Sequence, residues 1–366
     1  MKTNIKKTIA CKGINQFQIN EFLTTTHLPK AGDVAIFEVL SLGKHKRIQA
    51  TDGKARYIFP GDRIMAAFGN RYASAQFEGY LPSGIQTEFH ILGMGGAIGL
   101  VESTHSKFRS VGPTRLRLIG YATDEKGVIN TKYYYHKGKW FNREESLAQM
   151  SSKIILSIGS SMDSGKTTTA GYLCRGIKQA GKRVAFIKLT GTVYSKDADF
   201  ARDCGADLSL DFSHFGYPST YMEDLPELMK LYENLLHAAS AISPEYIVVE
   251  IADGIMQRET KALLTHPGFM GSIHQVIFSC GDSLAASGGM STLSAYNITP
   301  LALAGLFTAS PLMIQEVKDF CALPVLTLAD LAKPEILNLL AGTSPERKRT
   351  FPVETSFNGL VLKRIA

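Results

Sequence analysis

The pattern of apolar and polar positions changes near residue 140 of this 366-residue chain. Before that point, short apolar segments are separated by turns rich in Gly, Pro and Asp. Short strands at this spacing are typical of a small β-barrel or β-sandwich. The strands predicted in this half are 33–40, 55–59, 63–68, 88–92, 97–101 and 115–122.

Beyond residue 153, continuous apolar runs alternate with segments of helix length. Such runs indicate a parallel sheet with helices on both faces, because each strand is then buried on both sides. The predicted strands are 154–158, 184–189, 246–251, 275–280, 301–307 and 324–328. The predicted helices are 167–180, 222–241, 257–264, 284–296 and 312–320.

These patterns predict an α/β domain with a parallel sheet, preceded by a smaller β-rich domain that is a barrel or a sandwich. We place the β-rich domain at residues 1–140 and a polar linker at 141–153. The α/β domain follows at 154–345, and a C-terminal tail occupies 346–366.

Composition narrows the class of protein. Hydrophobic residues make up 45% of the chain, which is enough for a packed core, but no run approaches the ~20 apolar residues that span a bilayer. The five cysteines are scattered without C-x-x-C spacing, so we expect reduced, mostly buried thiols in a cytoplasmic protein. The net charge of +7 is dispersed, without an aromatic stacking motif beside it. We therefore expect anionic small molecules rather than nucleic acid or a membrane as partners.

Residues 154–169 carry the most informative motif. An apolar strand leads into a loop of small residues, and Gly165-Lys166-Thr167 opens a helix. This order is that of a phosphate-binding loop, in which backbone N–H groups and the helix N-terminus bind phosphate oxygens. The α/β domain is therefore predicted to be a P-loop NTPase domain. The nucleotide-binding residues we expect are Gly159, Ser161, Asp163, Ser164, Gly165, Lys166, Thr167 and Thr168.

Two residues of this loop have specific expected roles. Lys166 would contact the β- and γ-phosphates of ATP as a catalytic residue, and the Thr167 hydroxyl would bind Mg²⁺. The usual pattern G-x-x-x-x-G-K-[ST] requires glycine at position 160, where this chain has Ser160 and carries its glycine at 159. An ordinary Gly/Ser connection between strand and helix is the alternative.

The next predicted strands end in charged residues. Lys188 ends the strand at 184–189, and Glu250 and Asp253 lie at the end of the strand at 246–251. Ligands of open α/β sheets bind beyond the carboxyl ends of the strands. We therefore expect Lys188 and Glu250 to be catalytic, and Glu250 and Asp253 to join Thr167 as Mg²⁺ ligands. The alternatives are an exposed lysine at a strand end and a helix N-cap at Asp253.

Three further acids and one glycine-rich segment leave open questions. Asp197, Asp199 and Asp203 are candidates for a second metal contact, and the sequence does not choose among them. The glycines at 93–99 are similar to a dinucleotide-binding fingerprint, but they lie among predicted short strands and no predicted helix follows them. We expect a bulge or a tight turn there.

The loop from Gly159 to Thr167 resembles the G-T-x-x-x-x-G-K-T loop of dethiobiotin synthetase. That family continues with a strand ending in K-P-V-x-S-G, where this chain has Lys188-Leu-Thr-Gly, and with V-E-G-A-G-G, where it has V-E-I-A-D-G at 249–254. Residues 216–221 and 250–260 also resemble the DUF1611 group, which shares this domain and includes members identified as amino-acid N-acyltransferases. The resemblance covers about residues 154–330 and implies the SIMIBI class of P-loop NTPases, which often form homodimers.

The resemblance implies an enzyme that uses ATP and Mg²⁺ to activate a small carboxylate-type acceptor by phosphoryl transfer, as a ligase does. One alternative is an NTPase switch that binds a partner through the β-rich domain. Another is an N-acyltransferase whose loop binds the phosphates of acyl-CoA. The sequence does not identify the acceptor, and it leaves these three functions open.

Overall fold

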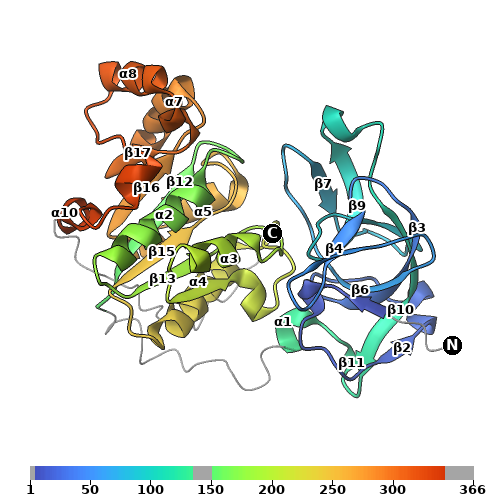
Figure 1. The fold of residues 1–366 in the computed structure, drawn as a ribbon. Helices are drawn as coiled ribbons and strands as arrows, with labels where there is room; N and C mark the ends of the chain where they lie inside the picture. Colours follow the sequence, from blue (N-terminus) through green and yellow to red (C-terminus); the bar gives the residue numbers. More distant parts are fainter. Residues whose placement is uncertain (1–4, 135–150, 343–366) are drawn as a thin grey trace, which may run out of the picture.

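The computed structural model describes residues 5–134 and 151–342, which form two lobes (Figure 1). Residues 5–134 form a β-rich domain and residues 151–342 an α/β domain with a parallel sheet, which confirms the expected fold class. Only the last three residues of the expected linker are described, and Lys153 among them begins a strand. The expected tail lies outside the described residues.

Five strands of the β-rich domain pair in a closed ring, so this domain is a small barrel. The ring runs from β6 through β3, β10, β8 and β9 back to β6. Inward-facing side chains, among them Phe37, Phe68 and Phe89, pack as one buried cluster. The strands are β1 (Ile5–Lys7), β2 (Gln18–Asn20), β3 (Val34–Ser41), β4 (Arg47–Gln49), β5 (Ala55–Tyr57), β6 (Arg63–Phe68), β7 (Phe77–Tyr80), β8 (Glu88–Ile91), β9 (Ala97–Thr104), β10 (Arg115–Asp124) and β11 (Gly127–Val128). The short helix α1 (Thr131–Tyr134) follows them.

The α/β domain contains a six-stranded parallel sheet with the strand order β14-β13-β15-β12-β16-β17. Because the strands are parallel, their carboxyl ends meet at one edge, where sheets of this kind bind ligands. The strands are β12 (Lys153–Gly159), β13 (Val184–Lys188), β14 (Leu208–Asp211), β15 (Tyr246–Glu250), β16 (Gln275–Ser279) and β17 (Ala302–Ala304). The helices are α2 (Lys166–Gln179), α3 (Lys196–Asp203), α4 (Leu225–Ser240), α5 (Arg258–Thr265), α6 (Pro267–Ser272), α7 (Ser283–Ala295), α8 (Pro311–Phe320), α9 (Leu328–Leu331) and α10 (Ile336–Ala341).

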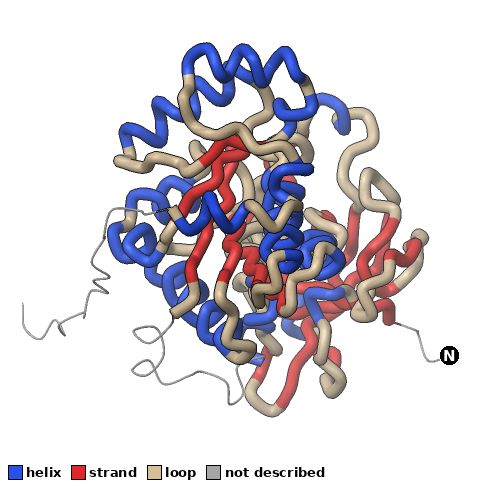
Figure 2. Tube along the Cα trace, turned by 60° about the vertical axis from the view of Figure 1, so that its left-hand side comes forward, coloured by secondary structure: helices blue, strands red, loops and turns tan. Residues whose placement is uncertain are grey.

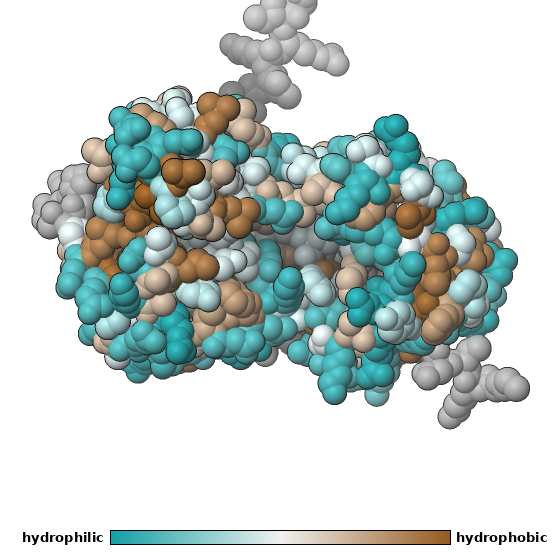
Figure 3. All heavy atoms as spheres, turned by 45° about the horizontal axis from the view of Figure 1, so that its top comes forward, coloured by the Kyte–Doolittle hydropathy of each residue, from teal (hydrophilic) through white to brown (hydrophobic). Residues whose placement is uncertain are grey.

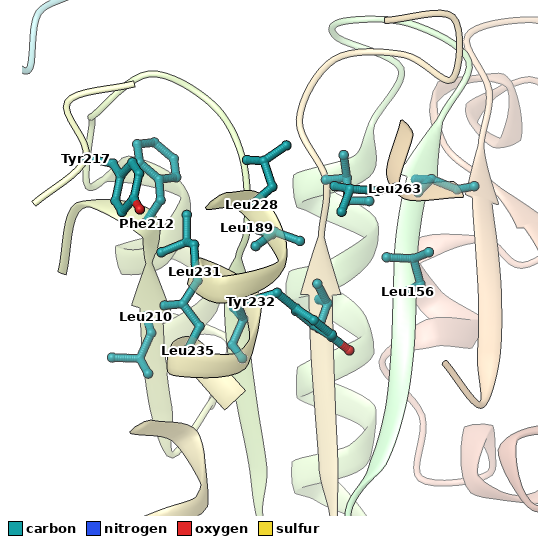
Figure 4. Packing of buried hydrophobic residues seen from close by; sticks show 14 of the residues in the cluster. Leu156, Leu189, Leu210, Phe212, Tyr217, Leu228, Leu231, Tyr232, Leu235 and Leu263 are labelled. Atoms are coloured by element: carbon teal, nitrogen blue, oxygen red, sulfur yellow. The ribbon is translucent and has the colours of Figure 1, made fainter. Parts of the chain in front are cut away.

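Helices cover both faces of this sheet (Figure 2). On one face, Leu173 of α2 belongs to a buried cluster with Phe186 of β13. On the other face, Leu231 of α4 belongs to a cluster with Leu189 and Leu210 (Figure 4). Burial on both faces explains why the strands are continuous apolar runs in the sequence.

The differences between the predicted and the observed elements include two in the α/β domain. Residues 324–328 do not form a strand: Val325 makes one isolated parallel bridge to Leu303, and Thr327 caps helix α9. Pro324 has no N–H with which to extend the bridge into a ladder. Strand β14 was not predicted, because it has only four residues and two of them are polar. Helix α3 was not predicted either.

Two expectations from composition concern cysteines and membrane spans. All five cysteines are free, and four of them are buried. No helix within residues 5–134 or 151–342 combines the length and the apolar character needed to cross a membrane.

The two domains share a continuous apolar core. Met65 and Ala67 of the barrel belong to the same buried cluster as Val193 and Tyr217 of the α/β domain. An apolar interface of this kind is expected to hold the domains in one arrangement. Polar contacts add to it: Thr131 Oγ1 donates to the Gly216 carbonyl (2.5 Å), the hydroxyls of Tyr80 and Tyr221 share a hydrogen bond (2.9 Å), and Lys132 pairs with Glu223.

In the segment 93–99, a tight turn ends where β9 begins at Ala97, and this turn brings the barrel backbone against the α/β domain. The N–H of Gly96 donates to the Gly93 carbonyl, which closes the turn. A Cβ atom at Gly95 would lie 1.9 Å from the carbonyl oxygen of Val193. Glycine is therefore required at position 95 by the neighbouring domain.

We expect Gly95→Ala to lower the free energy of unfolding by about 1–3 kcal/mol, because the added methyl group must push the domains apart. The measurement is urea unfolding followed by circular dichroism. Gly84→Ala is the matched control, since a Cβ there meets no atom within 4 Å. Equal stability of the two variants would contradict the described interface.

Candidate functional site

The connection between β12 and α2 is a tight loop that requires glycine where it begins. A Cβ at Gly159 would lie 2.2 Å from Ser164 Oγ. Two residues of the loop have positive φ: Asp163 (60°) and Gly165 (97°), which is the N-cap of α2. Left-handed backbone is costly for a non-glycine residue and is often found at ligand sites. The loop leads into the first N–H groups of α2, which is where a phosphate-binding loop holds its ligand.

Lys166 is buried inside this loop. Its Nζ donates to the carbonyl oxygen of Ser161 (2.7 Å), and the residue is 6% exposed. Burial lowers the pKa of Lys166, and the carboxylates of Glu250 and Asp253 oppose this by favouring the charged form. An ammonium group has three donors. Those that Ser161 does not use are available to phosphate oxygens.

Thr167 and Glu250 form a pair that fits a Mg²⁺ ion. Thr167 Oγ1 donates to Glu250 Oε1 (2.8 Å). Glu250 is 1% exposed, and its Oε2 has no hydrogen-bond partner among the described residues. A buried carboxylate oxygen without a partner is costly, and hydroxyl and carboxylate oxygens are ligands that Mg²⁺ prefers.

Lys188 lies beside Glu250 because the two occupy paired positions on the neighbouring strands β13 and β15. Lys188 Nζ is 3.8 Å from Glu250 Oε1 and forms an ion pair with Asp197 of α3. Burial alone would lower the pKa of Lys188, but these carboxylates outweigh it and hold the pKa above its usual value. Burial also raises the pKa of Glu250, against the effect of Lys188. The alternative of an exposed Lys188 is therefore wrong.

Asp253 lies just beyond β15 in a left-handed conformation, with φ of 63°. It does not cap a helix: the N-cap of α5 is Gln257, whose side chain accepts from Thr260 N. Burial raises the pKa of Asp253 to about 6, although Lys166 and Lys188 act in the opposite direction.

The three acids of α3 have different surroundings. Asp197 pairs with Lys188 at the carboxyl edge of the sheet. Asp199 accepts from Ser195 Oγ (2.5 Å) and pairs with Arg202, and Asp203 is exposed at the end of the helix. Of the three, only Asp197 is therefore in contact with a predicted site residue. Among the remaining loop residues, Ser161 and Asp163 are exposed and Thr168 is half-buried.

Two residues near the site come from the barrel and were missed in the sequence. Gln49 makes two hydrogen bonds to Ser195, which precedes α3: its Nε2 donates to Ser195 Oγ (2.7 Å) and its Oε1 accepts from Ser195 N (3.0 Å). Arg71 follows β6, and its charge acts on Asp253 together with those of Lys166 and Lys188. A single Gln in a short strand and a single Arg in a turn carry no sequence motif, so only the tertiary structure could identify them.

Among known proteins, those that resemble this chain are solved structures. No family model matches the sequence, and no curated protein does. Solved structures that resemble it include the signal recognition particle receptor FtsY from Elizabethkingia anophelis (13% identity, 57% of this chain and 70% of that chain, TM-score 0.33). A ParA family ATPase from Chlorobium tepidum TLS also resembles it (11% identity, 52% and 94%, TM-score 0.32). So does a GTPase from Pyrococcus abyssi (16% identity, 52% and 97%, TM-score 0.31).

By their descriptions these neighbours are a receptor, a GTPase and an ATPase, but a likeness at such low TM-scores carries no argument about function. The P-loop assignment for this chain rests on its own parallel sheet, on the loop between β12 and α2, and on Lys166 inside that loop.

The raised pKa of Asp253 predicts a pH-dependent contribution to stability. Between about pH 4 and pH 6, the folded protein retains a proton on Asp253 that the unfolded chain has released. The contribution of this carboxyl to the free energy of unfolding therefore falls as pH rises through that window, and it is constant above it.

We expect Asp253→Asn to remove this effect, because asparagine keeps the shape and tolerates positive φ. The stability of the variant relative to wild type should rise by about 1–2 kcal/mol from pH 4 to pH 7, after allowance for the partial exposure of Asp253. Urea unfolding at a series of pH values measures this difference. Parallel pH profiles would show that Asp253 does not titrate in that range.

Proposed function

We propose that this protein is a Mg²⁺-dependent P-loop enzyme that transfers the γ-phosphoryl group of ATP to a small carboxylate-type acceptor. The observation that carries the proposal is the convergence of Lys166, Thr167, Lys188 and Glu250 at one edge of the parallel sheet. Homodimer assembly and a cytoplasmic location stay predictions from the sequence.

Each of these residues has a distinct role in the proposal. When bound, Mg²⁺ offsets negative charge on the phosphates. Thr167 and Glu250 would hold the ion through the oxygens that now face each other. Lys166 would donate to phosphate oxygens through the N–H groups that Ser161 does not use. Lys188 would stabilise negative charge that develops between the phosphoryl group and the acceptor.

The charges of the site favour a carboxylate acceptor. A carboxylate is deprotonated at neutral pH, so its attack on phosphorus requires no general base. It does require cations to offset its charge as it approaches the phosphate, and the charges of Lys166, Lys188 and Arg71 all act near Asp253 at this edge. The sequence resemblance to dethiobiotin synthetase supports the same type of reaction.

A nucleotide-dependent switch is the second candidate, and a specific chain of contacts favours it. Gln49 of the barrel holds Ser195, which begins the turn of α3 that carries Asp197. Asp197 in turn pairs with Lys188 in the site. A nucleotide that draws Lys188 away from Asp197 would therefore act on an element that the barrel holds.

We expect Lys166→Ala to lower Mg²⁺-dependent ATP turnover about 100-fold or more, because a charged contact to the phosphates is lost. Turnover is measured with ATP, with GTP and with no added acceptor. Lys182→Ala is the control, since this exposed lysine pairs with Glu245 away from the loop. Turnover equal to wild type in folded Lys166→Ala would rule out the site, and binding of acyl-CoA without nucleotide turnover would favour the acyltransferase.

We expect Lys188→Ala to lose turnover and also to destabilise the fold by about 2–4 kcal/mol, because Glu250 and Asp197 are left without their cation. The double variant Lys188→Ala/Asp197→Ala should recover part of the stability and none of the turnover. Thermal unfolding and ATP hydrolysis measured on the same samples separate the two effects. Recovery of turnover in the double variant would show that Lys188 has only a structural role.

A further inference from the structure

Arg71 is an unusual residue of the barrel, because its side chain is fixed by neutral partners alone. It follows β6, where its backbone pairs with Gly79 in an isolated bridge. Its Nη1 donates to the carbonyl oxygen of Leu92, and its Nη2 donates to Gln76 Oε1 (2.9 Å). These two contacts orient the guanidinium group. They leave several of its five N–H donors unused.

The charge of Arg71 is not neutralised locally. Within residues 5–134 and 151–342, no carboxylate lies within ion-pair distance of it, and its buried Nε–H has no hydrogen-bond partner. Burial lowers the pKa of Arg71 to about 10, and Asp253 is the group that opposes this shift. A shielded cation without an adjacent anion is costly, so an anionic ligand at this position would be bound favourably.

Two observations place Arg71 near the site. Asp253 lies within the electrostatic range of Arg71, of Lys166 and of Lys188. A Cβ at Gly93 would lie 3.1 Å from both Arg71 Nη1 and Thr192 Cγ2, so the guanidinium lies next to the loop that follows Lys188. In Figure 3 the surface is hollowed between the two lobes. Arg71 therefore lies at the domain boundary, near the residues that follow β13 and β15.

An aromatic cluster borders this position. Tyr72 packs against Tyr221 of the α/β domain with ring centroids 5.5 Å apart, and Tyr80 packs against Tyr221 at 5.8 Å. The charge of Asp253 also acts on the Tyr72 hydroxyl, whose pKa is raised mainly by burial. These tyrosines of both domains therefore meet at the domain boundary, and Tyr72 is next to Arg71 in the chain.

We propose that Arg71 is an oxyanion-binding residue that the barrel contributes to the nucleotide site, so that the complete site lies between the two domains. Its ligand is either the carboxylate of the acceptor or the γ-phosphate of the nucleotide, which offer the same oxygen acceptors to a guanidinium. This proposal rests on the proposed function, because it takes the loop at Lys166 to hold a nucleotide.

The test is to measure three affinities of the full-length protein in wild type, in Arg71→Gln and in Arg71→Lys. The probes are Mg²⁺ with ADP, Mg²⁺ with a non-hydrolysable ATP analogue, and sodium benzoate with and without Mg²⁺-ADP. Benzoate supplies a carboxylate on an aromatic ring and is followed by ligand-detected NMR. Arg109→Gln, which changes an exposed arginine of the same domain, is the matched control.

We expect both Arg71 variants to lower the affinity for at least one of these anions about tenfold or more. Even lysine cannot reproduce the planar fork of arginine. Weakened benzoate binding assigns Arg71 to the acceptor. A loss confined to the ATP analogue, with ADP affinity as in wild type, assigns it to the γ-phosphate. Circular dichroism shows whether the two Arg71 variants are folded. If both are folded and their three affinities equal those of Arg109→Gln, the proposal is overturned. Failure of wild type itself to bind ADP would instead contradict the proposed function, and the benzoate measurement without nucleotide would still test Arg71.

Discussion

The site depends on the register between β13 and β15. Lys188 and Glu250 are paired positions on these parallel strands, so the backbone ladder itself holds a lysine beside a carboxylate at the edge of the sheet. Strand β12 pairs with β15 on its other side and leads into the loop that carries Lys166. A shift of one residue in either ladder would turn the last side chains of the strand to the opposite face. The apolar packing on both faces of the sheet prevents that shift, and in this way the core determines the chemistry of the edge.

The register leaves the buried carboxylate of Glu250 incompletely paired. Glu250 Oε1 accepts a hydrogen bond from Thr167, while Oε2 is buried and unpaired among the residues that the structure describes. Lys188 is shared between Glu250 and Asp197. Further positive charge near Glu250 would remove the imbalance. A divalent cation brought by a nucleotide is the simplest source of it.

The sequence predicted the parallel sheet and the loop well, because both depend on local patterns. Continuous apolar runs placed β12, β13, β15 and β16 within one or two residues of their observed bounds, and Gly165 to Thr167 opened α2 as expected. The role of Asp253 could not be decided from the sequence, because Asp253 and Gln257 are both able to cap a helix. The position of α5, whose N-cap is Gln257, decides between them. Gln49 and Arg71 could not be found at all. Their contacts arise only when the barrel closes and packs on the α/β domain, and no spacing in the chain records that.

The most direct test of the central claim is a crystal structure of the full-length protein grown with Mn²⁺ and a non-hydrolysable ATP analogue. Anomalous scattering locates the manganese ion, which takes the same oxygen ligands as Mg²⁺. We expect the ion at Thr167 Oγ1, with Glu250 bound directly or through water and the phosphates inside the loop of Lys166. An ion bound away from Thr167 and Glu250, or a loop that holds no phosphate at saturating nucleotide, would contradict it.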